Sequence, residues 1–115
     1  MSSASKWQSL CRVEDLPEGC VRGFALPEAP RVEVIVMRDG DALRAYRNRC
    51  PHRGTPLNLT PDHFLDATGD FMVCSTHGAL FRLEDGYCVA GPCQGDTLSS
   101  LETRIADGVV EITGI

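Results

Sequence analysis

Two short motifs that each join a cysteine to a histidine constrain this chain more than any other feature. Cys50-Pro51-His52 and Cys74-Ser75-Thr76-His77 are separated by the 21 residues from Arg53 to Val73, and a glycine follows each motif, at Gly54 and Gly78. Thiolates and imidazoles are ligands for both iron and zinc in proteins. If the four side chains share one metal centre, the two motifs must fold into neighbouring loops.

A mixed [2Fe–2S] centre uses this set of ligands. Two thiolates hold one iron and two neutral imidazoles hold the other, which raises the reduction potential relative to a cluster with four cysteines. Each motif alone is a weak signal, but the pair is specific. The sequence therefore predicts Cys50, His52, Cys74 and His77 as ligands of an iron–sulfur cluster.

A structural zinc site in an interaction module is the main alternative from another class of protein. Two cysteines and two histidines also suit tetrahedral zinc. Zinc motifs usually pair cysteine with cysteine and histidine with histidine at short spacing, whereas each motif here is mixed. The order of the ligands therefore favours iron.

The motifs and their flanks resemble the two cluster-binding boxes of Rieske ferredoxins and related oxygenase components. The resemblance rests on Cys50 to Gly54 and on Cys74 to Phe81. Glu84-Asp85-Gly86 is similar to the turn after the second box, and Gly91-Pro92 is similar to the proline loop that covers the cluster. The resemblance runs from about Arg31 onward. It implies that the two cysteines ligate the inner iron and the two histidines the outer, solvent-facing iron.

The residues around these ligands indicate a class within the Rieske family. High-potential respiratory members carry hydroxyl groups two and four residues after the second histidine, where Ala79 and Phe81 stand here. They also carry a disulfide between the loops, at the positions of Thr55 and Thr76. The resemblance therefore implies a low-potential cluster, at roughly −150 mV. The other residues expected around the ligands are Gly54, Gly78 and Pro92.

Outside the motifs, short alternating or β-branched runs between glycine, proline and aspartate predict an all-β fold. One strand is expected at Gly19–Leu26. Two hairpins are expected, each with a turn that favours positive φ. They are Arg31–Met37, Asp39-Gly40 and Leu43–Asn48, then Leu98–Ile105, Asp107-Gly108 and Val109–Thr113.

The segment from Cys50 to about Leu98 differs from its flanks, being rich in cysteine, histidine, glycine and proline. Strands are expected only at Phe71–Val73 and Ala79–Leu83, and Thr60–Asp70 has the signals for one helical turn. Residues 1–115 are thus expected to form a single domain, a Rieske-like antiparallel β-sandwich or barrel with a cluster-binding subdomain at about 50–98. The segment between the boxes is longer than is usual for small Rieske ferredoxins.

Composition narrows the range of functions. With 43% hydrophobic and 23% charged residues, the chain reads as a soluble globular protein. Its net charge of −5 and dispersed basic residues argue against nucleic acid as a partner. Because Met1–Leu10 lacks an apolar signal-peptide core and no membrane span is apparent, a cytoplasmic, reducing location is expected.

Four further cysteines have no histidine at ligand spacing and are interpreted as packing thiols: Cys11, Cys20, Cys88 and Cys93. Two alternatives stay open for the last two, which lie five residues apart: they line the cluster pocket, or they form a redox-active pair. His63 is interpreted as a surface histidine in the segment between the boxes. Trp7 is interpreted as a core or edge aromatic residue.

The expected function is one-electron transfer, with no catalytic residues of its own. A flavin-dependent reductase would supply the electron, and an oxygenase or another terminal oxidoreductase would accept it at the His52/His77 edge. The alternative is a small Rieske subunit of a larger oxidoreductase, such as a nitrite-reductase-like assembly. The sequence predicts neither the oligomeric state nor the terminal substrate.

Overall fold

The computed structural model describes residues 7–26, 29–40, 42–51, 54–58, 62–75 and 78–114, with the backbone alone at 29–31. Regular structure in these residues is β, apart from a short 3-10 turn at Val13–Asp15. The strands are β1 (Gln8–Arg12), β2 (Val21–Leu26), β3 (Ala29–Asp39), β4 (Ala42–Arg47), β5 (Phe71–Val73), β6 (Leu80–Arg82), β7 (Cys88–Ala90), β8 (Ser100–Ala106) and β9 (Val109–Thr113). The described part of the chain holds no helix long and apolar enough to span a bilayer.

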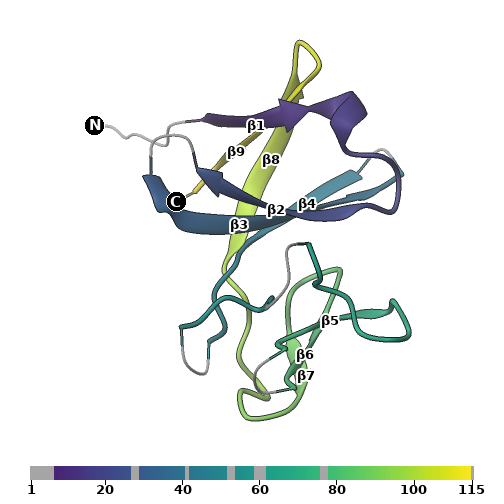
Figure 1. The fold of residues 1–115 in the computed structure, drawn as a ribbon, viewed down its shortest axis with the longest axis vertical. Helices are drawn as coiled ribbons and strands as arrows, with labels where there is room; N and C mark the ends of the chain where they lie inside the picture. The colour runs from purple at the N-terminus through teal and green to yellow at the C-terminus, as the bar shows by residue number, and fades with distance from the viewer. Residues whose placement is uncertain are drawn as a thin grey trace.

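Six strands form one antiparallel sheet in the order β1-β9-β8-β4-β3-β2. The end strands β1 and β2 approach each other, so the sheet curls towards a closed barrel (Figure 1). Alternate side chains point inwards, as the period of a strand requires. The inward side chains of the strands pack with Leu16, which follows the 3-10 turn, and form an apolar core of their own. Its members are Leu16, Leu26, Val34, Val36, Ala45, Val110 and Ile112. The expected all-β, barrel-like fold is confirmed.

Both predicted hairpins are present. The first joins β3 to β4, but its turn lies one residue later than expected. Asp39 still pairs with Ala42, and Gly40, at φ 63°, is the left-handed residue of the turn. In the second hairpin, Asp107 and Gly108 both have positive φ, at 52° and 76°, and they connect β8 to β9 as predicted. This backbone twist matches the twist of the strands.

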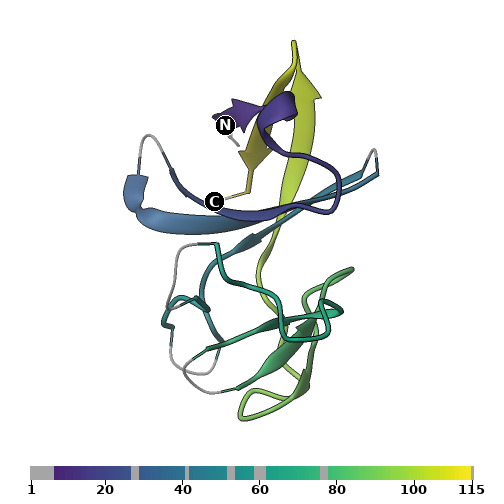
Figure 2. The same cartoon turned by 45° about the vertical axis from the view of Figure 1, so that its right-hand side comes forward.

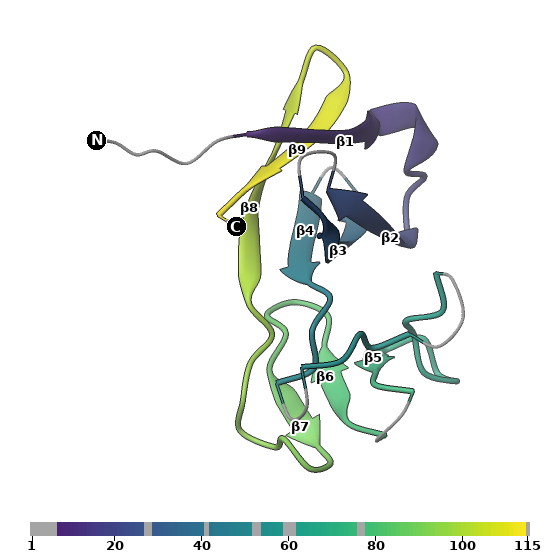
Figure 3. The same ribbon diagram turned by 60° about the vertical axis from the view of Figure 1, so that its left-hand side comes forward.

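A second, three-stranded sheet in the order β5-β6-β7 lies beyond one end of the barrel (Figures 1 and 2). The chain enters this unit after β4 and returns to the barrel through β8. Figure 3 shows the tip of the β8–β9 hairpin pointing away from it. β5 matches the predicted strand, and β6 is shorter than the predicted Ala79–Leu83. β7, like β1, was not predicted.

The predicted helical turn at Thr60–Asp70 is wrong for residues 62–70, and its first residues, Thr60 and Pro61, lie outside the described part of the chain. A tight turn forms instead around the carboxylate of Asp66. Its Oδ1 accepts hydrogen bonds from the Thr68 hydroxyl at 2.7 Å and from the Gly69 amide at 3.0 Å. Such a side chain competes with the helical backbone for the same donors.

Contacts on two sides join the second unit to the barrel. The Tyr46 hydroxyl in β4 donates to the Leu83 carbonyl at 2.8 Å. On the other side, Phe64 packs so closely on β2 that a Cβ at Gly23 would lie 2.9 Å from its ring, while the Gly23 amide donates to Asp62 at 2.9 Å. The long segment between the two boxes therefore lies against β2.

Candidate metal centre

Cys50 begins a loop directly after β4, and its side chain is fully buried. The loop closes on its own backbone. The Gly54 amide donates to the Cys50 carbonyl at 2.7 Å, and the Cys50 amide donates to the Thr55 carbonyl at 2.7 Å. Gly54 has φ 75°, a conformation that a residue with a Cβ rarely adopts. This explains the glycine after the first motif.

Cys74 begins a loop after β5 and repeats the same arrangement. The Gly78 amide donates to the Cys74 carbonyl at 2.7 Å, and the Cys74 amide donates to the Ala79 carbonyl at 2.9 Å. Gly78 has φ 74°, close to the value at Gly54. Cys74 is also fully buried. The two loops therefore close with the same pair of hydrogen bonds and hold their cysteines at equivalent positions.

The two loops lie side by side. The Ser75 amide of the second donates to the Leu57 carbonyl at the end of the first, at 2.8 Å. Cys50 and Cys74 belong to one apolar core, together with Leu57, Ala79 and Phe81. The structure thus brings together the two predicted thiol ligands from distant parts of the chain. The other predicted ligands, His52 and His77, lie outside the described residues, as does Thr76.

Asn48 anchors the first loop to the barrel, a role that the sequence reasoning missed. Its Oδ1 accepts the Leu57 amide at 2.8 Å, and its Nδ2 donates to Asn58 at 2.8 Å and to Glu33 at 3.3 Å. The side chain is buried, so these bonds replace those that water would supply. Only its position two residues before Cys50 could have drawn attention to it.

The remaining residues expected around the ligands fall into two groups. Ala79 and Phe81 are fully buried, and neither carries a hydroxyl group. Gly54, Thr55, Gly78 and Pro92 are exposed. The covering turn, residues 91–95, packs tightly on the second loop, since a Cβ at Gly91 would lie 2.6 Å from the Ala79 Cα. These four exposed residues are uncharged, but exposed Arg49, directly before Cys50, holds its guanidinium close to Gly54.

Two further thiols lie in the same core. The Sγ atoms of Cys88 and Cys93 are 3.3 Å apart, and both side chains are buried. Burial, the hydrogen bond with Cys88 and the nearby Cys50 thiol raise the pKa of Cys93 to about 12. Cys93 is therefore a neutral thiol beside a proposed ligand. The spacing of Cys88 and Cys93 in the sequence indicated that they could form a pair. It did not show whether the two thiols only pack together or also react.

The other candidates lie away from the two loops. Cys11 and Cys20 are half-buried near the start of the barrel, and burial raises the pKa of each thiol. His63 is exposed, as expected. The guanidinium of Arg104 stacks 4.1 Å from the centre of the Trp7 ring, which gives Trp7 a packing role at the edge of the barrel.

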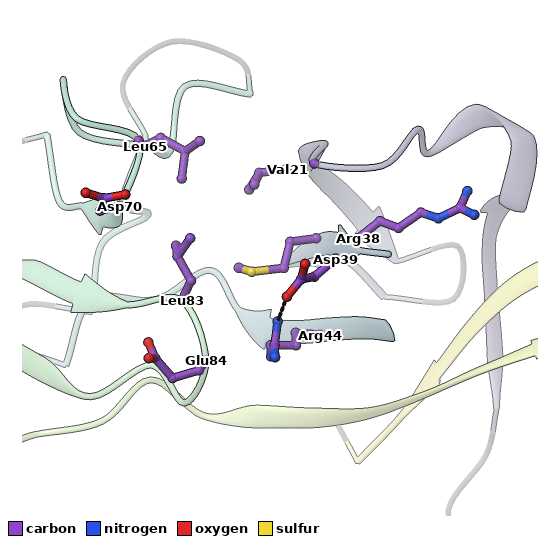
Figure 4. A pocket seen from close by; sticks show the side chains of 11 residues that line it. Val21, Arg38, Asp39, Arg44, Leu65, Asp70, Leu83 and Glu84 are labelled. Atoms are coloured by element: carbon purple, nitrogen blue, oxygen red, sulfur yellow. Dashed lines mark hydrogen bonds and ion pairs between the residues drawn. The ribbon is translucent and has the colours of Figure 1, made fainter. Parts of the chain in front are cut away.

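A cleft of about 520 Å³ opens between the barrel and the segment before β5 (Figure 4). Val21, Leu65 and Leu83 face this space. Asp39 and Arg44, paired at 3.2 Å, lie at its rim. Neither Cys50 nor Cys74 lines the cleft, so it is separate from the candidate metal centre.

The donor set of the centre fits a thiolate-ligated cluster. Two thiols lie buried in apolar surroundings, on loops whose hydrogen-bonded backbones fix their positions. Cysteines bind iron as thiolates, and a dry shell around the metal tunes its potential. Among the described residues, no three histidine, cysteine or carboxylate side chains converge as a metal site.

Comparisons with known proteins agree with this chemistry. A family model described as "Rieske [2Fe-2S] domain" matches residues 6–104. The oxygenase component of a chloroacetanilide N-alkylformylase from Rhizorhabdus wittichii is 34% identical over 87 residues, covering 75% of this chain and 22% of that protein. Oxidoreductase NdmD from Pseudomonas putida is 30% identical over 92 residues, covering 80% of this chain and 14% of that protein. The chain thus spans less than a quarter of either curated relative.

Two solved structures match this chain over nearly the whole length of both proteins. A chain in the complex of reduced oxygenase and oxidized ferredoxin of carbazole 1,9a-dioxygenase is 28% identical, with a TM-score of 0.71 and coverage of 94% of this chain and 93% of that one. The ferredoxin of carbazole 1,9a-dioxygenase from Nocardioides aromaticivorans IC177 has a TM-score of 0.71 at 21% identity, covering 98% of this chain and 100% of that one. The second match supports the fold.

Proposed function

The chain belongs to the family of Rieske [2Fe–2S] domains, and from this premise we propose that it is a one-electron carrier that delivers electrons to an oxygenase. The observation that carries the proposal is the pair of equivalent loops that place Cys50 and Cys74 in one buried core. The proposed unit is a single domain over residues 1–115, with the cluster-binding subdomain at about 50–98.

The proposed ligands are Cys50 and Cys74 for one iron and His52 and His77 for the other. When bound, the cluster supplies a reversible one-electron step. The chain's own residues set the conditions for that step. Buried Leu57, Ala79 and Phe81 exclude water from the cysteine side. Pro51 and Pro92 are exposed, and the guanidinium of exposed Arg49 close to Gly54 adds a positive charge to the surface beside the first loop.

The partners follow from the names of the relatives. One curated relative is an oxygenase component, and one similar structure is a complex of an oxygenase with a ferredoxin. We propose an oxygenase as the electron acceptor and a flavin-dependent reductase as the donor. The protein would carry out no catalysis itself, and a cytoplasmic location remains a prediction.

A second role is favoured by one observation. The chain matches segments of relatives that are several times longer, 22% and 14% of their lengths. The same domain could therefore serve as an internal relay in a larger oxidoreductase. Size-exclusion chromatography of the natively expressed protein separates a free carrier from a subunit of a larger complex.

The cluster assignment is tested by composition and spectroscopy. Purified protein should contain iron and acid-labile sulfide in equal amounts, absorb in the visible, and show the low average g-value of a histidine-ligated cluster in EPR after reduction. Cys74→Ser should remove these signals, and Cys11→Ser, on the barrel, should retain them. A colourless protein that contains zinc would contradict the proposal.

The carrier role needs a second experiment. In stopped-flow mixing, a flavin-dependent reductase should bleach the visible bands within its turnover time, and an oxidised Rieske oxygenase should restore them. Holoprotein that is reduced but then fails to reoxidise with any oxygenase would retain the family assignment and contradict the role as carrier.

A further inference from the structure

The cysteine pair in the covering region has no role in the proposed ligand set. Cys88 lies in β7, and Cys93 lies in the covering turn, residues 91–95. Their Sγ atoms are 3.3 Å apart, with exposed fractions of 0% and 3%. The chain has six cysteines, and this contact joins two of them directly.

The backbone imposes the contact. The Gly95 amide donates to the Cys88 carbonyl at 3.1 Å, and the Cys88 amide donates to the Asp96 carbonyl at 2.8 Å. Gln94 completes the turn through its amide, which donates to the Gly91 carbonyl at 3.2 Å. The turn therefore folds back on β7 and holds the two thiols together at a high effective concentration.

The surroundings favour sulfur chemistry over metal binding at this pair. Among the described residues, no third histidine, cysteine or carboxylate joins the two thiols as a possible metal ligand. Two sulfurs in a disulfide lie about 2.05 Å apart, so closing the bond requires an approach of only about 1.3 Å. Side-chain rotation and a small movement of the turn are enough for a shift of that size.

We propose that Cys88 and Cys93 form a reversible dithiol–disulfide couple, a redox modification site beneath the covering turn. Its oxidant is a small-molecule disulfide such as glutathione disulfide. When the turn opens, the Cys93 thiol is no longer buried and can lose its proton. Its thiolate attacks a sulfur of this reagent, forms a mixed disulfide and releases one glutathione thiolate, which takes up that proton. The second cysteine then attacks the mixed disulfide and releases the second glutathione. Two protein thiols are oxidised and one glutathione disulfide is reduced to two thiols.

Access to the pair runs through the turn. Pro92 and Gln94 on either side of Cys93 are exposed, so a local opening of this short turn uncovers the sulfur without unfolding the barrel. Reaction at Cys93 would also change the surroundings of Cys50, because the Cys93 thiol interacts with both Cys88 and Cys50. The proposed modification therefore takes place next to a proposed ligand of the cluster.

The chain offers a direct test by peptide mass. Trypsin cleavage after Arg82 and Arg104 releases residues 83–104, which contain Cys88 and Cys93 and no other cysteine. Holoprotein is equilibrated with glutathione redox buffers of increasing oxidising strength, quenched with an alkylating reagent under denaturing conditions, and digested. The expected peptide carries no alkyl group, is lighter than the dithiol form by two hydrogen atoms, and regains both thiols with dithiothreitol.

Two controls are built into the same digest. Cys11 and Cys20 fall in separate peptides, 7–12 and 13–22, and report oxidation that depends on exposure alone. In Cys93→Ser, Cys88 can be alkylated or form a mixed disulfide but can form no internal bond. Peptide 83–104 that stays doubly alkylated in the most oxidising buffer, or that carries two glutathione adducts, would overturn the proposal.

Discussion

Asn48 shows how one polar side chain can set the geometry of a metal site without touching the metal. Its amide group connects the end of the first cysteine loop, at Leu57 and Asn58, to Glu33 in β3. Leu57 in turn receives the amide of Ser75 from the second loop. The position of one loop relative to the other therefore depends on a residue that ligates nothing.

We expect Asn48→Ala to lower the free energy of unfolding by about 1–3 kcal/mol, because the buried Leu57 amide loses its acceptor. Urea denaturation followed by circular dichroism measures the change. Gln94→Ala, at an exposed position, should stay within about 0.5 kcal/mol of the wild type. Equal stability of the two variants would contradict the anchoring role.

The side chains of Ala79 and Phe81 lead to an expectation for the reduction potential of the cluster. Both are buried close to Cys74 in the chain, and neither side chain can donate a hydrogen bond to a cluster sulfur. Such bonds raise the potential of iron–sulfur clusters. Protein-film voltammetry should give roughly −150 mV, at the lower end of the Rieske range. A value above about +100 mV would contradict the expectation of a low-potential cluster.

At the scale of elements, the second unit depends on how closely its turns pack. Gly91 brings the covering turn against Ala79 of the second loop, and Gly86 brings the turn after β6 against Tyr46 of β4, where a Cβ would lie 2.9 Å from the ring. Both glycines have positive φ, at 101° and 74°. At both positions, the positive φ and the close contact with a neighbouring residue each require glycine.

Gly91 and Gly95 provide a matched pair that separates these two requirements. Both have φ near +100°, but a Cβ at Gly95 meets no atom within 4 Å. Gly95→Ala should therefore cost about 1–2 kcal/mol from backbone strain alone. Gly91→Ala should cost a further 1–3 kcal/mol, approximately, from overpacking on Ala79. Thermal unfolding compares them, and equal losses would argue against close packing of the covering turn.

Tyr46 connects β4 to the second unit and makes that connection sensitive to pH. Burial raises its pKa, so folding favours the neutral phenol. This contribution to stability is complete below the unfolded pKa of about 10 and is lost as pH rises through the folded pKa. Tyr46→Phe should cost about 1 kcal/mol at neutral pH through the lost bond to Leu83. In urea titrations, the difference in the free energy of unfolding between Tyr46→Phe and the wild type should be smaller at about pH 11 than at neutral pH. A difference that stays constant with pH would contradict this linkage.

At the scale of the whole molecule, the protein has two apolar cores with different tasks. The core of the barrel contains neither Cys50 nor Cys74. The other core contains both cysteines and extends to Ile35, Met37 and Tyr46 of the barrel wall. The barrel can therefore remain folded while the region around the metal centre changes.

Removal of iron by a chelator under reducing conditions should affect the two cores differently. Amide hydrogen exchange is expected to rise in the two cysteine loops and the covering turn, because the metal no longer crosslinks them. The β8–β9 hairpin should keep its protection, since its inward side chains belong to the core of the barrel. Equal loss of protection in both regions would mean that the molecule unfolds as one unit.

The elements predicted correctly are those with local signals. Alternation of side chains and a turn with positive φ are enough to specify a hairpin, and both hairpins formed. β1 carries no such signal, because it pairs with β9 at the other end of the chain. β7 does follow a turn with positive φ at Gly86, but it has only three residues, too few for an alternating pattern to show. The helical turn before β5 failed because the side chain of Asp66 supplied acceptors for the backbone.

For the candidate site, the sequence alone determined the chemistry of the donors, since residue type and spacing identify which groups can bind iron. Only the tertiary structure decided that the two loops close with the same hydrogen bonds and need glycine at a positive φ, that Asn48 joins the first loop to the barrel, and that Cys93 lies against Cys88. These features depend on contacts between segments far apart in the chain or on the detailed path of a turn, and no local pattern of residues encodes either.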